Sequence, residues 1–81
     1  MALPTHRGEC PRPDEVTALR EEFFPTDGRG TKLISQQSFA ECIWYSIRPI
    51  QHWEAGKRKC PAHTWELAMV YFGKWQPRFH A

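Results

Sequence analysis

Residues 35–58 read SQQSFAECIWYSIRPIQHWEAGKR, and they contain the strongest structural signals in this 81-residue chain. Ser35 is a residue type that commonly caps the N-terminus of a helix. Behind it, Phe39, Ala40 and Ile43 are spaced so that they fall on one face of a helix. The first part of the stretch therefore predicts a capped two-turn helix from the residue after Ser35 to Ile43.

The second part of the stretch predicts another short helix after a tight turn. Ser46 is placed to cap it, and Pro49 is tolerated because it falls in the first turn. Ile50 and Trp53 are three residues apart and form an apolar stripe. Gly56 stands where helices commonly end in a left-handed residue. The stretch as a whole therefore predicts two short capped helices joined by a tight turn.

Two more helices are predicted on either side. One covers about 13–23, where Pro13 suits a first turn and Pro25 stops the helix. The other covers about 62–72, ahead of Gly73, because apolar and aromatic residues recur there every three or four positions. The side chains expected to face inward are Phe39, Ala40, Ile43, Ile50, Trp53, Trp65, Ala68, Met69 and Phe72.

These elements predict an all-α fold, a small four- to five-helix domain. Its length allows a single core. We place the domain at 13–73, after an irregular N-terminal arm at 1–12 and before a C-terminal tail at 74–81. Asp-Gly and a second nearby glycine indicate a loop at 25–34 between the first two helices.

Composition narrows the class of protein. Hydrophobic residues at 41% and charged residues at 25% are ordinary for a globular chain. No apolar run is long enough to span a bilayer, and the N-terminus lacks the apolar core of a signal peptide, so we expect a cytoplasmic protein with no membrane partner. There is no glycine-rich phosphate loop, nucleophile elbow or paired-carboxylate motif. We therefore expect no enzymatic activity and no cofactor.

The net charge of +2 is small, but the charges are unevenly distributed. Residues 1–40 contain five Lys or Arg and six Asp or Glu, whereas residues 41–81 contain six Lys or Arg and three Asp or Glu. The basic run at 57–59 lies in that second half. Such a run is either a solvated loop or a contact to a polyanion.

Three cysteines are an odd number, which argues against a disulfide framework. Cys42 lies on an apolar helical face and is expected to be a small core residue. His6, Cys10, Cys60 and His63 have spacings that zinc can use, but the two halves lie far apart and neither contains a doubled CxxC. We therefore favour no metal site.

Several separate constraints agree with one known pattern. The small Ala40 in mid-helix allows two helices to cross closely. The second helix is capped, it ends in Trp-Glu-x-Gly, and Pro61 follows. With these features, the sequence resembles the Cro/phage-repressor helix-turn-helix family, also called the XRE family. The resemblance covers about half of the chain. It is carried by Ser35-Gln36-x-x-Phe39-Ala40-x-x-Ile43, Ser46-x-x-x-Ile50-x-x-Trp53-Glu54-x-Gly56-x-Arg58 and Pro61.

The resemblance implies a lambda-repressor-like domain that reads the major groove of double-stranded DNA with the helix at about 46–56. The expected function is a sequence-specific transcriptional regulator, a small repressor of phage, plasmid or antitoxin type. A homodimer on a palindromic operator is expected, because one such domain makes few base contacts. Its dimer surface would use the last helix and the tail (Tyr71, Trp75 and Phe79), unless these rings pack within the monomer.

The outward face of the second helix supplies the candidate reading residues. Arg48 could bind guanine through two hydrogen bonds, and Gln51 could read adenine. His52 could donate to a purine or a phosphate, and Ile47 could touch a thymine methyl group. Each of these residues could instead be a solvated surface residue.

The resemblance itself implies further contacts. Gln36, with Gln37 beside it, would open the supporting helix and bind a phosphate, and Ser46 would do likewise. Arg20 in the first helix would form an ion pair with Glu54. The basic run would clamp the DNA backbone through Lys57, Arg58 and Lys59.

Three departures from the family pattern bear on the expected docking to DNA more than on the fold. Trp44 replaces the usual glycine of the turn, so it either adopts a positive φ at a backbone cost or reshapes the turn. The loop at 25–34 is longer than the family's usual connection and could be a wing-like contact. Pro49 removes a polar group from the reading face. Trp44 and the modest net charge keep an alternative open, a protein-binding inhibitor or adaptor, for example phage-encoded, that reuses the fold.

Overall fold

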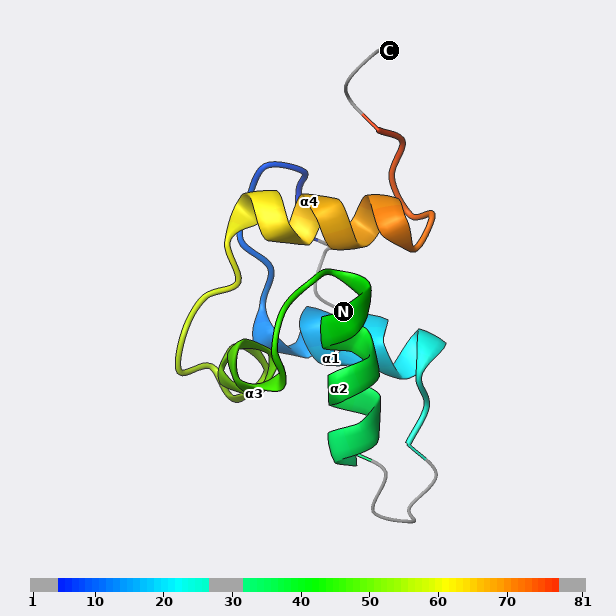
Figure 1. The fold of residues 1–81 in the computed structure, drawn as a ribbon. Coiled ribbons are helices and arrows are strands. Elements are labelled where there is room, and N and C mark those ends of the chain that lie inside the picture. The colour runs from blue at the N-terminus through cyan, green and yellow to red at the C-terminus, as the bar shows by residue number, and fades with distance from the viewer. Residues whose placement is uncertain (1–4, 27–31, 78–81) are drawn as a thin grey trace.

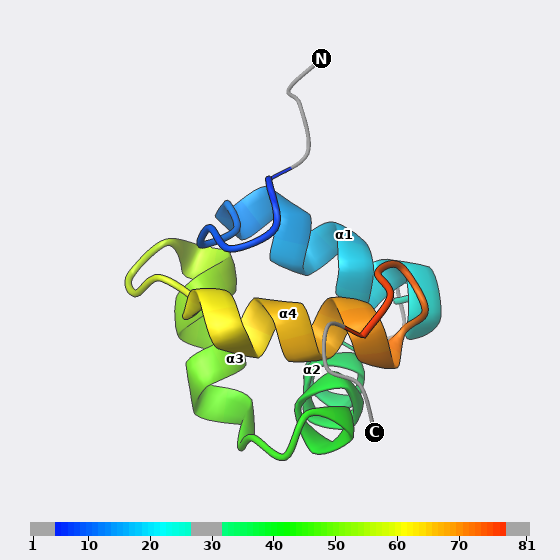
Figure 2. The same cartoon turned by 90° about the horizontal axis from the view of Figure 1, so that it is seen from above.

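The computed structural model describes residues 5–26 and 32–77, and it is all-helical over these ranges (Figure 1). The predicted all-α class is therefore confirmed at this level. The helices α1, α2 and α3 pack against one another, and α4 lies across one side of that group in both views (Figures 1 and 2). The four helices are α1 (Pro13–Phe23), α2 (Lys32–Cys42), α3 (Ile47–Ala55) and α4 (Ala62–Tyr71). None of the described helices is long and apolar enough to cross a membrane.

The core lies where the four helices meet. All five inward residues predicted for the central stretch are buried, with Ala40 and Ile50 fully inaccessible. Met69 and Phe72, which were predicted to face inward, are half-buried and pack against the edge of the core. The core residues are Val16, Leu19, Phe39, Ala40, Ile43, Ile50, Trp53, Cys60, Trp65 and Ala68.

The bounds of α1 agree with the prediction at both ends. Pro13 is its first residue. The Glu15 carboxylate accepts the backbone N–H groups of Arg12 at 3.1 Å and of Thr5 at 2.8 Å, which ties the arm to the helix. At the other end, the N–H of Phe24 bonds to the carbonyl of Arg20 at 2.7 Å and closes the last turn.

The arm at 5–12 is irregular, and it is held against the body of the domain. Arg7 forms an ion pair with Glu66 of α4, with its Nε 2.8 Å from Glu66 Oε2. The same guanidinium lies over the ring of Trp75, 5.2 Å from the centroid. Trp75 therefore packs within the monomer, one of the two alternatives left open for the tail aromatics.

The predicted start of α2 was wrong. The helix begins at Lys32, so Ser35 lies in its first turns rather than at its N-cap. Ser35 is 4% exposed: its hydroxyl donates to the carbonyl of Phe24 and accepts a hydrogen bond from Arg20 Nη1 at 2.8 Å. These two buried hydrogen-bond partners, which the sequence does not reveal, allow Ser35 to lie within the helix instead of at its N-cap. The predicted loop at 25–34 correspondingly loses its last three residues to α2, while residues 27–31 lie outside the described part of the chain.

The turn between α2 and α3 settles the question raised by Trp44. Trp44 has φ 60°, in the left-handed region, so it adopts the conformation that usually favours glycine. The N–H of Tyr45 bonds to the carbonyl of Ala40 at 2.8 Å, and that of Trp44 to Glu41 at 3.3 Å. This is the Schellman pattern, with tryptophan in the position where glycine is commonest.

Gly56 ends α3 as predicted, with φ 78°. A Cβ added there would meet only Pro13 Cγ at 3.7 Å, an ordinary contact. We therefore expect Gly56→Ala to destabilise the fold by about 1–2 kcal/mol through backbone strain alone. Gly56→Asn should cost less, because asparagine tolerates the left-handed region. Urea unfolding of both variants measures the difference; equal stabilities would show that φ is not the cause.

The cysteines are not arranged as expected. Cys42, the last residue of α2, is only half-buried, whereas Cys60 is 2% exposed and belongs to the core. The end of α4 agrees with the prediction. Gly73 follows α4 and has φ 78°, and the N–H of Lys74 bonds back to the carbonyl of Met69 at 2.8 Å.

Candidate nucleic-acid interface

The outward face of α3 carries most of the predicted reading residues. Ser46 precedes the helix in an extended conformation, with φ −86° and ψ 171°, and its side chain makes no capping hydrogen bond. Ser46 and Arg48 are exposed, while Ile47, Gln51 and His52 are half-buried. These side chains are therefore available along one face, because Ile50 and Trp53 turn the opposite face into the core.

The basic run follows α3 at its far end. Lys57, Arg58 and Lys59 are all exposed and lie in an irregular segment before α4. The N–H of Lys57 bonds to the carbonyl of His52 at 2.9 Å, which fixes where this segment leaves the helix. A nine-residue helix is about 13 Å long, so the cations and Ser46 lie at opposite ends of α3, separated by about that distance.

A buried polar network fixes α3 to α1. Arg20 and Glu54 form the ion pair expected from the resemblance, with side chains only 2% and 7% exposed. The guanidinium binds both carboxylate oxygens, Nε to Oε2 at 2.7 Å and Nη2 to Oε1 at 2.9 Å. Thr17 donates to Oε1 at 3.1 Å. The carboxylate therefore accepts three hydrogen bonds from α1, and these join α3 to α1 beside their apolar contacts.

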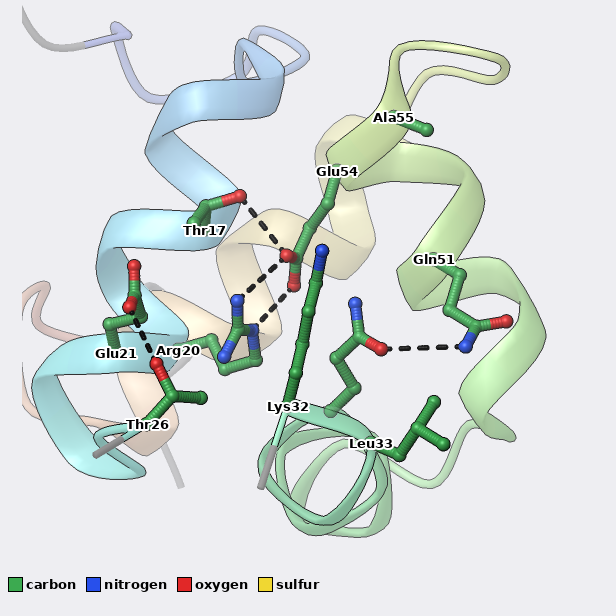
Figure 3. Close-up of a pocket in the computed structure, with 10 residues that line it drawn as sticks. Thr17, Arg20, Glu21, Thr26, Lys32, Leu33, Gln51, Glu54 and Ala55 are labelled. Atoms are coloured by element: carbon green, nitrogen blue, oxygen red, sulfur yellow. Dashed lines mark hydrogen bonds and ion pairs between the residues drawn. The ribbon is translucent and has the colours of Figure 1, made fainter. Parts of the chain in front are cut away.

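The network forms the floor of a groove of about 570 Å³ between α1, α2 and α3 (Figure 3). Gln51, one of the predicted reading residues, lines this groove and donates through Nε2 to Oε1 of Gln36 at 3.4 Å. Lys32 extends its side chain across the groove from the start of α2 (Figure 3). The groove thus adjoins the outward face of α3.

The predicted position of Gln36 at the start of its helix was wrong. Because α2 begins at Lys32, Gln36 lies in the second turn, and its backbone N–H is no longer among the unpaired groups of a helix N-terminus. The Gln36 side chain is 3% exposed and is bonded to Gln51 instead. Gln37 is exposed and donates to Glu41 at 3.2 Å.

Sequence reasoning missed the extra turn of α2. It presents Lys32, Leu33 and Ile34 to solvent, and the two apolar side chains are 61% and 67% exposed. Lysine and leucine are good helix formers, so a propensity count would have extended the helix toward them. That signal was outweighed by the capping preference of Ser35.

The four residues weighed for zinc do not form a metal cluster. Within the described ranges, no group of three or more His, Cys, Asp or Glu side chains could hold a metal ion. Cys10 and Cys60 line one cavity of about 330 Å³. Burial, with a smaller contribution from Cys10, raises the pKa of Cys60 to about 12.

Comparison of the chain with models of protein families, with curated proteins and with solved structures found no match.

Proposed function

We propose that the chain is a sequence-specific double-stranded DNA-binding regulator, a small repressor of phage, plasmid or antitoxin type. In this proposal α2 and α3 form a lambda-repressor-like helix-turn-helix, and α3 enters the major groove. The observation that carries the proposal is the two-sided character of α3. Its inner face is anchored by Ile50, Trp53 and the buried Glu54, while its outer face leaves Arg48 exposed in the first turn.

The proposed roles follow the exposure of each residue. Arg48 would bind a guanine edge, Ile47 a thymine methyl group, and His52 a purine or a phosphate. Gln51 would read adenine, with Gln36 holding its side chain amide in place rather than binding phosphate itself. The phosphate contacts would come from exposed donors: Gln37, Ser46, Lys57, Arg58 and Lys59.

A two-fold dimer would double these contacts on a palindromic operator. The protein would be cytoplasmic, and nucleoid-associated when bound to DNA. Trp75 is engaged by Arg7 within the monomer, so it has a smaller part in the proposed dimer surface. Tyr71, 58% exposed on α4, and Leu67, 37% exposed one turn earlier, remain for such a surface. Phe79 lies outside the described residues.

Two substitutions separate base reading from backbone binding. Arg48→Ala should weaken operator binding by roughly 1–3 kcal/mol and relax the sequence preference at one position. Lys57→Ala should weaken binding to all duplexes about equally and lower the salt slope by about one unit. Fluorescence anisotropy titrations at several salt concentrations measure both effects. If both variants bind as tightly as the parent, α3 does not dock in the groove as proposed.

One observation favours the alternative of a protein-binding inhibitor or adaptor. Leu33 and Ile34 expose apolar side chains on the first turn of α2, and Leu33 also lines the groove. A polyanion has no apolar surface to cover these two side chains, whereas a protein partner does. Substituting both with serine should abolish binding to a protein partner and leave duplex binding intact. A partner bound with little dependence on salt, together with no duplex binding, would favour this alternative.

A further inference from the structure

Trp44 combines two features that the fold itself does not require. Its backbone adopts φ 60°, a conformation that glycine accommodates and L side chains rarely adopt. Its indole is 85% exposed, so the ring contributes little to the core. Neither the turn nor the packing therefore favours tryptophan over glycine here. Strained residues of this kind commonly persist where they contact a ligand.

The neighbours of Trp44 are occupied elsewhere. Ile43, just before it, is 1% exposed and belongs to the core. Tyr45, just after it, packs its ring edge-on against Trp53 at 5.2 Å and shares a hydrogen bond between its hydroxyl and that of Thr64 at 2.7 Å. Trp44 thus projects alone from the turn.

The turn lies beside the start of α3, at the end of the molecule away from the N-terminal arm (Figure 2). Trp44 is two residues before Ser46, the N-cap of α3, and four before Arg48 in its first turn. When the first turn of a reading helix enters the major groove, phosphate strands run along both edges of that groove. A side chain just outside the helix start then faces one of these strands.

We propose that Trp44 binds the sugar–phosphate backbone of DNA at the edge of the groove that α3 enters. This inference rests on the proposed function. The apolar face of the indole covers a deoxyribose, and its Nε1–H, which can only donate, bonds to a phosphate oxygen. The contact does not depend on the base sequence. It positions α3 so that the base-reading side chains of the helix reach the base edges.

A second copy of the chain is a poorer fit to this site. Self-association needs a contiguous apolar surface of several hundred Å². The other large exposed apolar side chains of the described chain are on other elements or at the far end of α2: Phe23 on α1, Leu33 and Ile34 at the start of α2, and Leu67 and Tyr71 on α4. A single ring with one hydrogen-bond donor is a better match for a DNA backbone, in which apolar deoxyribose faces alternate with anionic phosphates.

The test is Trp44→Gly, because its effects on folding and binding have opposite signs. Relief of the left-handed backbone should leave the melting temperature unchanged or a few degrees higher. Loss of the indole should weaken duplex binding by about tenfold, since a hydrogen bond to a charged group is lost.

The probes are a fluorescein-labelled mixed-sequence duplex and the duplex most enriched from a random library. Both should lose affinity by the same factor, because the contact is to the backbone. The salt slope should not change, because the indole is uncharged, in contrast to the reduced slope of Lys57→Ala. These two results together distinguish Trp44 from a base-reading residue and from a cationic clamp.

The outcomes are separable. Full-strength duplex binding by Trp44→Gly overturns this inference and leaves the proposed function standing. A parent protein that binds neither duplex refutes the proposed function, and the inference with it. Loss of self-association in Trp44→Gly by sedimentation velocity, with unchanged duplex binding per protomer, assigns the ring to a second copy and also overturns the inference.

Discussion

Replacing Glu54 with alanine is expected to destabilise the domain by about 3–5 kcal/mol, because it leaves a charged guanidinium buried without its partner. Arg20 is 2% exposed, so its guanidinium is shielded from most of the water that could replace the lost carboxylate. The side chain would lose two of its three hydrogen bonds and keep only the one to Ser35. Single domains are stable by only about 5–15 kcal/mol, so a loss of this size is a large fraction of the total. Urea unfolding followed by circular dichroism measures it.

A double variant provides the control for this prediction. Arg20→Met with Glu54→Leu removes both charges and keeps similar volumes, so it should be far more stable than Glu54→Ala. Thr17→Val removes the third donor to the carboxylate and should cost about 1 kcal/mol. If Glu54→Ala costs no more than Thr17→Val, the ion pair does not fix α3 to α1 in the way described.

Phe39→Ala should destabilise the domain by a similar amount, about 3–5 kcal/mol, through the cavity it leaves. Phe39 is 1% exposed at the centre of α2. Its ring stacks on Phe72, with centroids 5.6 Å apart and an interplanar angle of 4°, and so joins α2 to the end of α4. Chemical denaturation of the variant measures the loss.

Phe23 is a matched control, because it stacks on the same ring from α1 but remains 39% exposed. Its centroid is 4.4 Å from that of Phe72. Phe23→Ala removes a ring pair without opening an interior cavity, so it should cost about 0.5–1.5 kcal/mol. Equal losses for the two variants would mean that burial of Phe39 is not the cause.

Local rules predicted the parts of the fold whose causes are local. Pro13 at the first turn of α1, Gly56 after α3 and the spacing of Ile50 and Trp53 each act through neighbours in the chain. Ala40 could be predicted to be buried because a close helix crossing needs a small residue at the contact. These positions therefore agree with the structure.

The sequence-based predictions were wrong where contacts between residues far apart in the sequence determine the local structure. Ser35 has the side chain of an N-cap, but a carbonyl eleven residues earlier and the Arg20 guanidinium hold it inside α2. Moving the helix start to Lys32 then changes the environment of Gln36, which bonds to Gln51 from another helix. No pattern within one segment reports such partners, so the exposure of α3 was easier to predict than the start of α2 and the environment of Gln36.

The most direct test of DNA reading by α3 is selection of bound duplexes from a random-sequence library by the folded 81-residue chain. The proposal predicts enrichment of a palindromic sequence with half-sites about 10 base pairs apart, bound by two protomers. It also predicts that Arg48→Ala loses the preference at one position in each half-site. No enrichment over the input library, with the protein folded throughout, would contradict the proposal.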